Sequence, residues 1–185
     1  MPFQPDVHLN LNVRGLGVSA TLAINERSNA LRQQGRQVYK LGLGQSPFPV
    51  PDVVVAALRE HATERDYLDV EGLPELRRAI AQWYQRRFGI SLDPDKEVLP
   101  LIGAKEGIGH IALGLLNPGD VALQPDPGYP VYNVGTLFAG GEPYWMPLTE
   151  ENGWLPDLRA VPEEVAERAT VMWLNYPNNP TAATA

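Results

Sequence analysis

From residue 97 onward, strand-like and helix-like segments alternate, and this alternation constrains the fold more than any other feature. The apolar runs predicted to be strands are 97–102, 120–124, 142–148 and 170–175. The segments predicted to be helices between them are 105–116, 131–140 and 162–169. Strands that alternate with helices of this length predict an α/β fold, a mostly parallel sheet with helices on both faces. The nearly continuous apolar runs at 120–123 and 170–174 are typical of strands buried on both faces.

The first 96 residues have a different rhythm, with three predicted helices and little strand. Residues 1–12 are irregular and are expected to form an arm. The predicted helices are 18–35, 51–62 and 73–89. Gly35 and Gly89 are expected to end the first and the last of them. A short predicted strand begins at Gln37 and passes into a Gly- and Pro-rich loop, and residues 66–72 form a second loop.

Composition and charge exclude several classes of function. The formal net charge is −7, and nucleic-acid binding normally needs a basic face. The chain has no cysteine, and His8, His61 and His110 are too scattered for a zinc site, so we expect no metal. The N-terminus lacks the basic start and apolar run of a secretory signal, and no apolar run is long enough to cross a bilayer. We therefore expect a cytoplasmic chain without nucleic-acid or membrane partners.

Three loops follow predicted strands, and ligands of open α/β sheets bind at the carboxyl ends of the strands. In the first loop, Gly103, Ala104 and Lys105 stand where a helix begins. Free backbone N–H groups and the helix dipole at such a position favour a phosphate, and Lys105 adds positive charge. A plain strand-to-helix turn accounts equally for this glycine-containing sequence taken alone.

The other two loops carry an aromatic ring and two amides. Tyr129 lies between a glycine and a proline, and Asn178 and Asn179 follow the last strand. Taken singly, the tyrosine fits a core or rim aromatic and the asparagines fit a turn. Taken together with the phosphate loop, they predict a site for a flat, phosphorylated, aromatic cofactor.

Five segments in this order resemble the class I/II aminotransferases, pyridoxal phosphate (PLP) enzymes of the aspartate aminotransferase fold. The segments are YLDVEGLPELRRAIAQWY (67–84), LPLIGAKEGIGHIALGLLNPGD (99–120), PDPGYPVY (125–132), AGGEPYWMPL (139–148) and LNYPNNPT (174–181). The stretch from Glu97 to Thr181 is most similar to LL-diaminopimelate aminotransferases. The resemblance implies a three-layer large domain that is incomplete here. Residues 1–45 would form the arm, helix and first strand, and residues 46–185 the first part of the PLP-binding domain.

The resemblance also implies roles for individual residues. Gly103, Ala104 and Lys105 match the loop that holds the cofactor phosphate. Tyr129 matches the aromatic residue that stacks on the pyridine ring, and Asn179 matches the asparagine that binds the cofactor's phenolic oxygen; both also face the substrate. The remaining matches are Tyr67, which in the family reaches the phosphate of the neighbouring subunit, and Gly44, which lies near the substrate carboxylate. On the residues alone, a loop-capping tyrosine and a turn glycine remain open for these two.

The chain departs from the family pattern in two respects. Ala182 stands where members usually have glycine, and alanine is strained where φ is positive. The lysine that binds the cofactor covalently is not recognisable, because Lys40, Lys96 and Lys105 are the only lysines and none matches it. We therefore expect no catalytic residue in these 185 residues and a fragment that is inactive alone. We expect it to associate as a homodimer or with a complementary C-terminal piece, because later strands would be missing from the sheet.

Three functions follow in order of preference. The first is a transaminase that moves an amino group between an amino acid and a 2-oxo acid. The second is a non-catalytic module that binds PLP or another phosphate, or only assembles with a partner, on the same scaffold. The third, a nucleotide-binding protein, ranks last because the chain has neither a Walker-type loop nor a Rossmann Gly-x-Gly-x-x-Gly opening.

Overall fold

The structure is a computed structural model that describes residues 9–14, 16–42, 44 and 46–185. Its contacts divide the chain into two compact units. One comprises the described residues of Gly15–Glu75, and the other comprises those up to Arg14 together with Leu76–Ala185. Most of the predicted N-terminal arm lies outside the described residues, and its final part forms the short 3-10 helix η1 (Leu11–Val13).

The unit of residues 15–75 contains two helices, α2 (Ala20–Gln33) and α3 (Asp52–His61), which confirms both helices predicted there. Gly35 follows α2 with φ +79°, a conformation that suits a glycine. The strand predicted to begin at Gln37 is wrong, since the described residues 37–42 form no strand. A strand needs a neighbour to which its backbone can bond, and the described part of this unit contains no strand that could pair with it.

The other unit begins with most of α4 (Pro74–Phe88), the third predicted helix. Gly89 follows it with φ +72°, as predicted. Three apolar residues near its end form a local ring cluster: Trp83, Tyr84 and Phe88 contact one another with centroids 5.3–5.4 Å apart. These rings remain partly exposed, so α4 leaves much of its apolar stripe uncovered.

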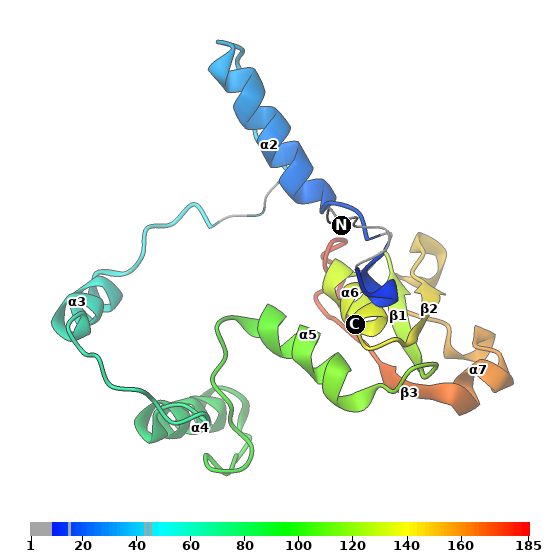
Figure 1. The fold of residues 1–185 in the computed structure, drawn as a ribbon. Coiled ribbons are helices and arrows are strands. Elements are labelled where there is room, and N and C mark those ends of the chain that lie inside the picture. The colour runs from blue at the N-terminus through cyan, green and yellow to red at the C-terminus, as the bar shows by residue number, and fades with distance from the viewer. Residues whose placement is uncertain (1–8, 15, 43, 45) are drawn as a thin grey trace, which may run out of the picture. The chain divides into compact units, whose positions relative to one another are not determined.

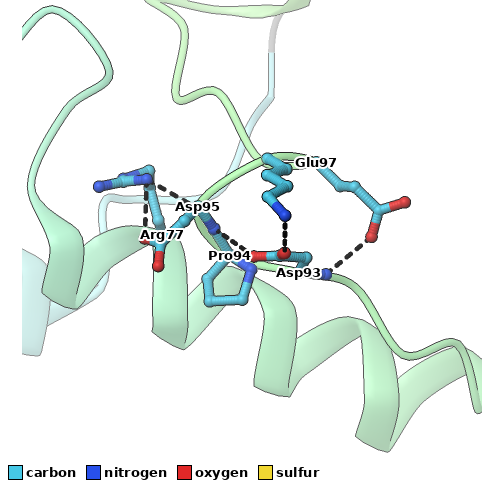
Figure 2. Close-up of polar contacts among 6 residues, drawn as sticks. Arg77, Asp93, Pro94, Asp95 and Glu97 are labelled. Atoms are coloured by element: carbon cyan, nitrogen blue, oxygen red, sulfur yellow. Dashed lines mark hydrogen bonds and ion pairs between the residues drawn. The ribbon is translucent and has the colours of Figure 1, made fainter.

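A polar clamp attaches the segment after α4 to the helix itself (Figure 2). The buried guanidinium of Arg77 donates from Nη1 to the carbonyl oxygen of Pro94 at 3.1 Å and to Oδ1 of Asp95 at 3.0 Å. The backbone N–H of Asp93 donates to Oε2 of Glu97 at 2.7 Å. This clamp sets the path of the chain from α4 toward α5.

The sheet of this unit has the order β2-β1-β3 with all strands parallel, which confirms the predicted parallel arrangement (Figure 1). Its strands are β1 (Val121–Asp126), β2 (Glu142–Pro147) and β3 (Ala169–Met172). The connecting helices are α5 (Ala104–Leu115), α6 (Pro130–Phe138) and α7 (Glu163–Arg168). Two 3-10 turns, η2 (Glu150–Asn152) and η3 (Leu158–Ala160), precede α7.

One predicted strand of this unit, 97–102, is wrong. The segment is not in the sheet, and β1 already has a neighbour on each side. The apolar pattern of 97–102 is suited to a strand, but the segment pairs with neither of the sheet's two open edges, which belong to β2 and β3. The phosphate loop at Gly103 therefore opens α5 without following a strand.

Alternate residues of β1 face two different layers, as the three-layer prediction requires. Ala122 packs with Ala112 and Leu116 at the α5 side of the sheet. Val121 and Leu123 pack with Met146 of β2 and with residues of the α7 side on the other face. Burial on both faces is confirmed for β1. It is wrong for β3, whose residues are only half buried or exposed because β3 has a neighbour along one edge alone.

Glycines allow α5 and α6 to approach each other closely. A Cβ on Gly135 of α6 would lie 3.2 Å from the Cβ of Ala112 and 3.6 Å from the carbonyl oxygen of Gly109, both in α5. A larger side chain at residue 135 would therefore push the two helices apart. Among the described residues, no helix combines the length and the apolar character that crossing a membrane requires.

Candidate functional site

The start of α5 offers unpaired backbone donors. Gly103 is the N-cap residue with φ +82° and ψ 149°, a conformation that L side chains rarely adopt, and no side chain caps the helix at this residue. Within the described part of the chain, no acceptor is recorded for the backbone N–H groups of Ala104 and Lys105. These amides and the positive end of the helix dipole can hold an anion.

Charged side chains flank these amides. Lys105 is exposed in the first turn of α5. Glu106, one residue later, accepts a hydrogen bond at Oε2 from the backbone N–H of Ile102 at 2.8 Å. The carboxylate thus pairs with an amide outside the helix, and the Ala104 and Lys105 amides stay available. Its negative charge nevertheless opposes an anion bound at the same helix end.

Tyr129 closes the loop after β1 and is the N-cap residue of α6. Its ring meets Tyr132 edge-on, with centroids 5.8 Å apart and planes at 80°. Tyr132 in turn stacks on Trp173, which follows β3. Burial, and then the neighbouring Tyr129, raise the pKa of the Tyr132 hydroxyl, so Tyr132 is a neutral support for the Tyr129 ring.

The loop after β3 presents one asparagine and buries the other. Asn179 is exposed, its backbone N–H donates to Oδ1 of Asn175 at 3.0 Å, and no partner is recorded for its side-chain amide among the described residues. Asn178 is only 3% exposed. Ala182 has φ +60°, which confirms that this position needs the left-handed conformation.

Two of these segments come together at one edge of the sheet, and the start of α5 belongs to the same unit. Because β1 and β3 are adjacent and parallel, the loops that follow them lie at the same edge. Asn178 joins them, since its Nδ2 donates to the carbonyl oxygen of Pro127 at 3.3 Å. Ala104 and Trp173 line one cavity of ≈ 570 Å³, together with Leu99, Leu101, Gly107, Ile108, His110 and Ile111. Tyr129 lines a second cavity together with Tyr132, and Tyr132 stacks on Trp173 of the first cavity.

Two residues predicted for the site belong to the other unit. Tyr67 lies in the loop before α4 with its side chain fully exposed, and Gly44 is itself exposed and belongs to no helix or strand. They are not among the residues that the unit of the sheet brings together.

The comparisons with known proteins decide the family. The family described as aminotransferase class I and II matches residues 36–185. The chain belongs to the class I and II aminotransferases. The cofactor of this aminotransferase family is PLP.

Curated aminotransferase relatives support the same assignment. The chain is 52% identical over 165 residues to the LL-diaminopimelate aminotransferase of Moorella thermoacetica, covering 88% of this chain and 42% of the relative. It is 46% identical over 180 residues to the enzyme of that name from Dehalococcoides mccartyi, covering 96% and 46%. The chain therefore spans less than half the length of the curated aminotransferases that it matches.

Solved aminotransferase-fold structures agree. Substrate-bound BacF from Bacillus subtilis aligns with a TM-score of 0.90 and 39% identity, covering 96% of this chain and 46% of that chain. Aspartate aminotransferase from Thermus thermophilus with maleate aligns with a TM-score of 0.85 and 31% identity, covering 95% and 46%. The three-layer fold predicted from the sequence is confirmed.

The chemistry of the donor set fits PLP. The open start of α5 suits a phosphate, and the Tyr129 ring suits a flat aromatic ring. The exposed Asn179 amide suits a phenolic oxygen. Two buried polar atoms of the region, Oδ1 of Asn178 and Nε1 of Trp173, have no hydrogen-bond partner among the described residues. The sequence-based site did not include Tyr132 or Trp173, and it offered Asn178 only as a second polar residue beside Asn179. The two asparagines were recognised as polar, but only burial distinguishes Asn178 from Asn179.

Proposed function

We propose that this chain contributes the cofactor-binding part of a PLP-dependent transaminase, which transfers an amino group between an amino acid and a 2-oxo acid. The observation that carries the proposal is the open start of α5 in the same unit as the Tyr129 and Asn179 loops, which Asn178 joins. When bound, PLP supplies the electron sink of the transfer.

The chain's own residues would bind and orient that group. The amides of Ala104 and Lys105 hold the phosphate, with Gly103 allowing the backbone to turn toward it. The Tyr129 ring covers one face of the pyridine and excludes water from it. The Asn179 amide donates to the phenolic oxygen and so favours its ionised form. Tyr67 and Gly44 keep their proposed roles, at the phosphate of a neighbouring subunit and near the substrate carboxylate.

We do not propose a covalent attachment to any lysine of this chain. Lys105 lies at the phosphate end of the site, and Lys96 is exposed and pairs with Asp93 at 3.9 Å. Lys40 binds Asn25 at 3.1 Å in the other unit. Because the chain spans less than half of its relatives, we propose that the covalent lysine comes from the part of their length that it does not span.

Assembly, location and boundaries form part of the same proposal. Many large apolar side chains remain exposed, among them Leu101, Ile102, Leu113 and Leu115 around α5. Such a surface supports association with a second copy or with a complementary polypeptide. A cytoplasmic location and the domain division at residues 45 and 46 also remain predictions.

Equilibrium binding of PLP to the purified chain tests the cofactor site. Lys105→Met should weaken binding about tenfold at low salt and by less at high salt, because a charge near the phosphate is lost. Lys96→Met is the matched control, since Lys96 is exposed in the segment after α4 and pairs with Asp93. This variant should bind PLP with the affinity of the unaltered chain. Gly103→Ala should also weaken binding, because alanine is strained at φ +82°. Equal affinities in all four proteins would contradict the phosphate site.

The non-catalytic module is kept as the second candidate because the chain has only these three lysines. Borohydride reduction followed by mass spectrometry tests whether the 185-residue chain holds PLP covalently. We expect no gain in mass for the 185-residue chain and no amino transfer by it alone. A cofactor-sized gain on Lys40, Lys96 or Lys105 would show that the chain holds PLP covalently by itself.

The names of the relatives suggest a substrate. The two curated relatives described above are named LL-diaminopimelate aminotransferases. We therefore propose a long dicarboxylic diamino acid as the amino donor of the assembled enzyme. Comparing this donor with aspartate, aromatic amino acids and methionine in the protein encoded by the whole gene tests the proposal. A higher kcat/KM with any of the other donors would contradict it.

A further inference from the structure

The geometry points to Asn178 as a positioning residue that fixes the Tyr129 loop against the Asn179 loop. This inference rests on the proposed function, because its consequence is the spacing between two residues proposed to hold PLP. Asn178 itself is buried and is not offered as a contact of the cofactor.

The side chain of Asn178 spans the two loops. Its Nδ2 donates to the carbonyl oxygen of Pro127, in the loop that carries Tyr129, at 3.3 Å. The same Nδ2 donates to Oγ1 of Thr181 at 3.0 Å, within its own loop. One amide group therefore bonds to backbone two residues from Tyr129 while it is covalently joined to Asn179.

The backbone of Asn178 closes its own loop. Its N–H donates to the carbonyl oxygen of Ala183 at 2.8 Å, and its carbonyl oxygen accepts from Ala182 at 2.7 Å. The residue is thus held at both backbone groups and at its side chain. Because Asn178 is fixed in this way, the Tyr129 loop and the Asn179 loop cannot move independently of each other.

The alternative is that Asn178 only fills a turn, as asparagine often does. Three observations disfavour it: the side chain is almost fully buried, its donor reaches a residue 51 positions away, and Oδ1 is buried without a recorded partner in the described part of the chain. The side chain of a turn asparagine normally forms hydrogen bonds with backbone groups of its own turn.

Asn178→Asp isolates the bond to Pro127. Aspartate has the same size, but the oxygen that replaces Nδ2 cannot donate to a carbonyl oxygen. Asn152→Asp is the matched control. Oδ1 of Asn152 accepts from the Thr149 backbone at 2.9 Å and from the Thr149 hydroxyl at 3.2 Å, and an aspartate oxygen can accept both bonds. Both variants add one negative charge, and Asn178→Ala, which adds none, separates the loss of the bond from a repulsion of PLP.

Two measurements are made on the full 185-residue chain: the affinity for PLP, and amide hydrogen exchange of the ligand-free protein. We expect N178D to weaken PLP binding about tenfold relative to N152D. We also expect faster exchange in two separate peptides, one over residues 126–132 and one over residues 175–183. Faster exchange in the second peptide alone, or unchanged PLP affinity, would overturn the inference.

The two proposals fail in different ways. If the unaltered chain binds no PLP, the cofactor site is wrong, whereas the exchange comparison still decides whether Asn178 joins the loops. If the buried carboxylate of N178D prevents folding, Asn178→Ala removes the donor without burying a charge, and the same outcomes apply.

Discussion

Tyr132 and Trp173 stack with their ring centroids 4.9 Å apart and their planes at 17°. The pair joins the first turn of α6 to the end of β3 directly behind Tyr129. The ring proposed to cover the cofactor therefore rests on a second ring, and that ring rests on the sheet.

A double-mutant cycle measures this stack. Tyr132→Leu, Trp173→Leu and the double variant should give a coupling of about 1 kcal/mol in the free energy of unfolding, because stacked aromatic pairs contribute beyond their buried area. A cycle of Tyr132→Leu with Trp83→Leu is the control and should be additive, since Trp83 packs in the separate ring cluster of α4. Additivity in both cycles would contradict a supporting role for the stack.

Ala182→Gly should stabilise the loop that carries Asn179. Alanine at φ +60° costs about 1–2 kcal/mol relative to glycine, part of which glycine loses again through its greater freedom in the unfolded chain. Ala183→Gly controls for that freedom, because Ala183 has no positive φ. The two variants should therefore differ by about 1–2 kcal/mol in the free energy of unfolding, measured by denaturant titration. If they lose stability equally, residue 182 carries no strain.

Two glycine substitutions test the contact between α5 and α6, because they should differ in their effect on the free energy of unfolding. Gly114→Ala should stabilise the protein by up to about 1 kcal/mol, because alanine favours the helix and a Cβ there meets nothing within 4 Å. Gly135→Ala should lose that gain, because its methyl group would lie 3.2 Å from the Cβ of Ala112 and push the helices apart. Equal stabilisation of both variants in denaturant titrations would show that the helices are not in close contact.

Acid should weaken the turn between α5 and β1 through Asp120. The backbone N–H of Asn117, followed by its side-chain amide, holds the pKa of the Asp120 carboxyl below 3.8, with smaller contributions from Thr170 and Arg168. The folded state thus favours the ionised carboxyl. Its stabilisation is present above the unfolded pKa and is lost as the pH falls through the lower folded value.

Asp120→Asn should accordingly flatten, but not abolish, the fall in stability below about pH 4. The pKa values of Asp157, next to Arg159, and Glu151 are also lowered, so their contributions persist in the variant. Denaturation midpoints at neutral and acidic pH provide the measurement. An unchanged acid dependence would mean that the Asn117 contacts do not favour the ionised form.

Local patterns predicted most elements because their causes are local. The apolar spacing from Leu76 to Phe88 and the positive φ of Gly89 delimit α4 without help from the rest of the fold. The strand at 97–102 was predicted from the same kind of pattern and failed. Pairing depends on a partner strand, and nothing within those six residues indicates whether one is present.

The candidate site divides in the same way. Gly103, Tyr129 and Asn179 were identified from residue type, order and family resemblance. Tyr132 and Trp173 were not identified, and Asn178 was recognised only as a polar loop residue. Their importance comes from burial and from contacts between segments far apart in the sequence. Ala182 belongs to the first group, since an alanine at a position where the family usually has glycine predicts strain from the family resemblance.

The sequence by itself determined which segments form helices, that the sheet is parallel, and which residue types stand at the start of α5 and at the ends of β1 and β3. These properties follow from side-chain spacing and backbone preferences over a few residues. Only the tertiary structure decided that the Tyr129 and Asn179 loops are tied together by one buried amide, and that 97–102 stays outside the sheet. Hydrogen bonds and ring contacts between distant segments depend on the packing of the whole unit, which no local pattern specifies.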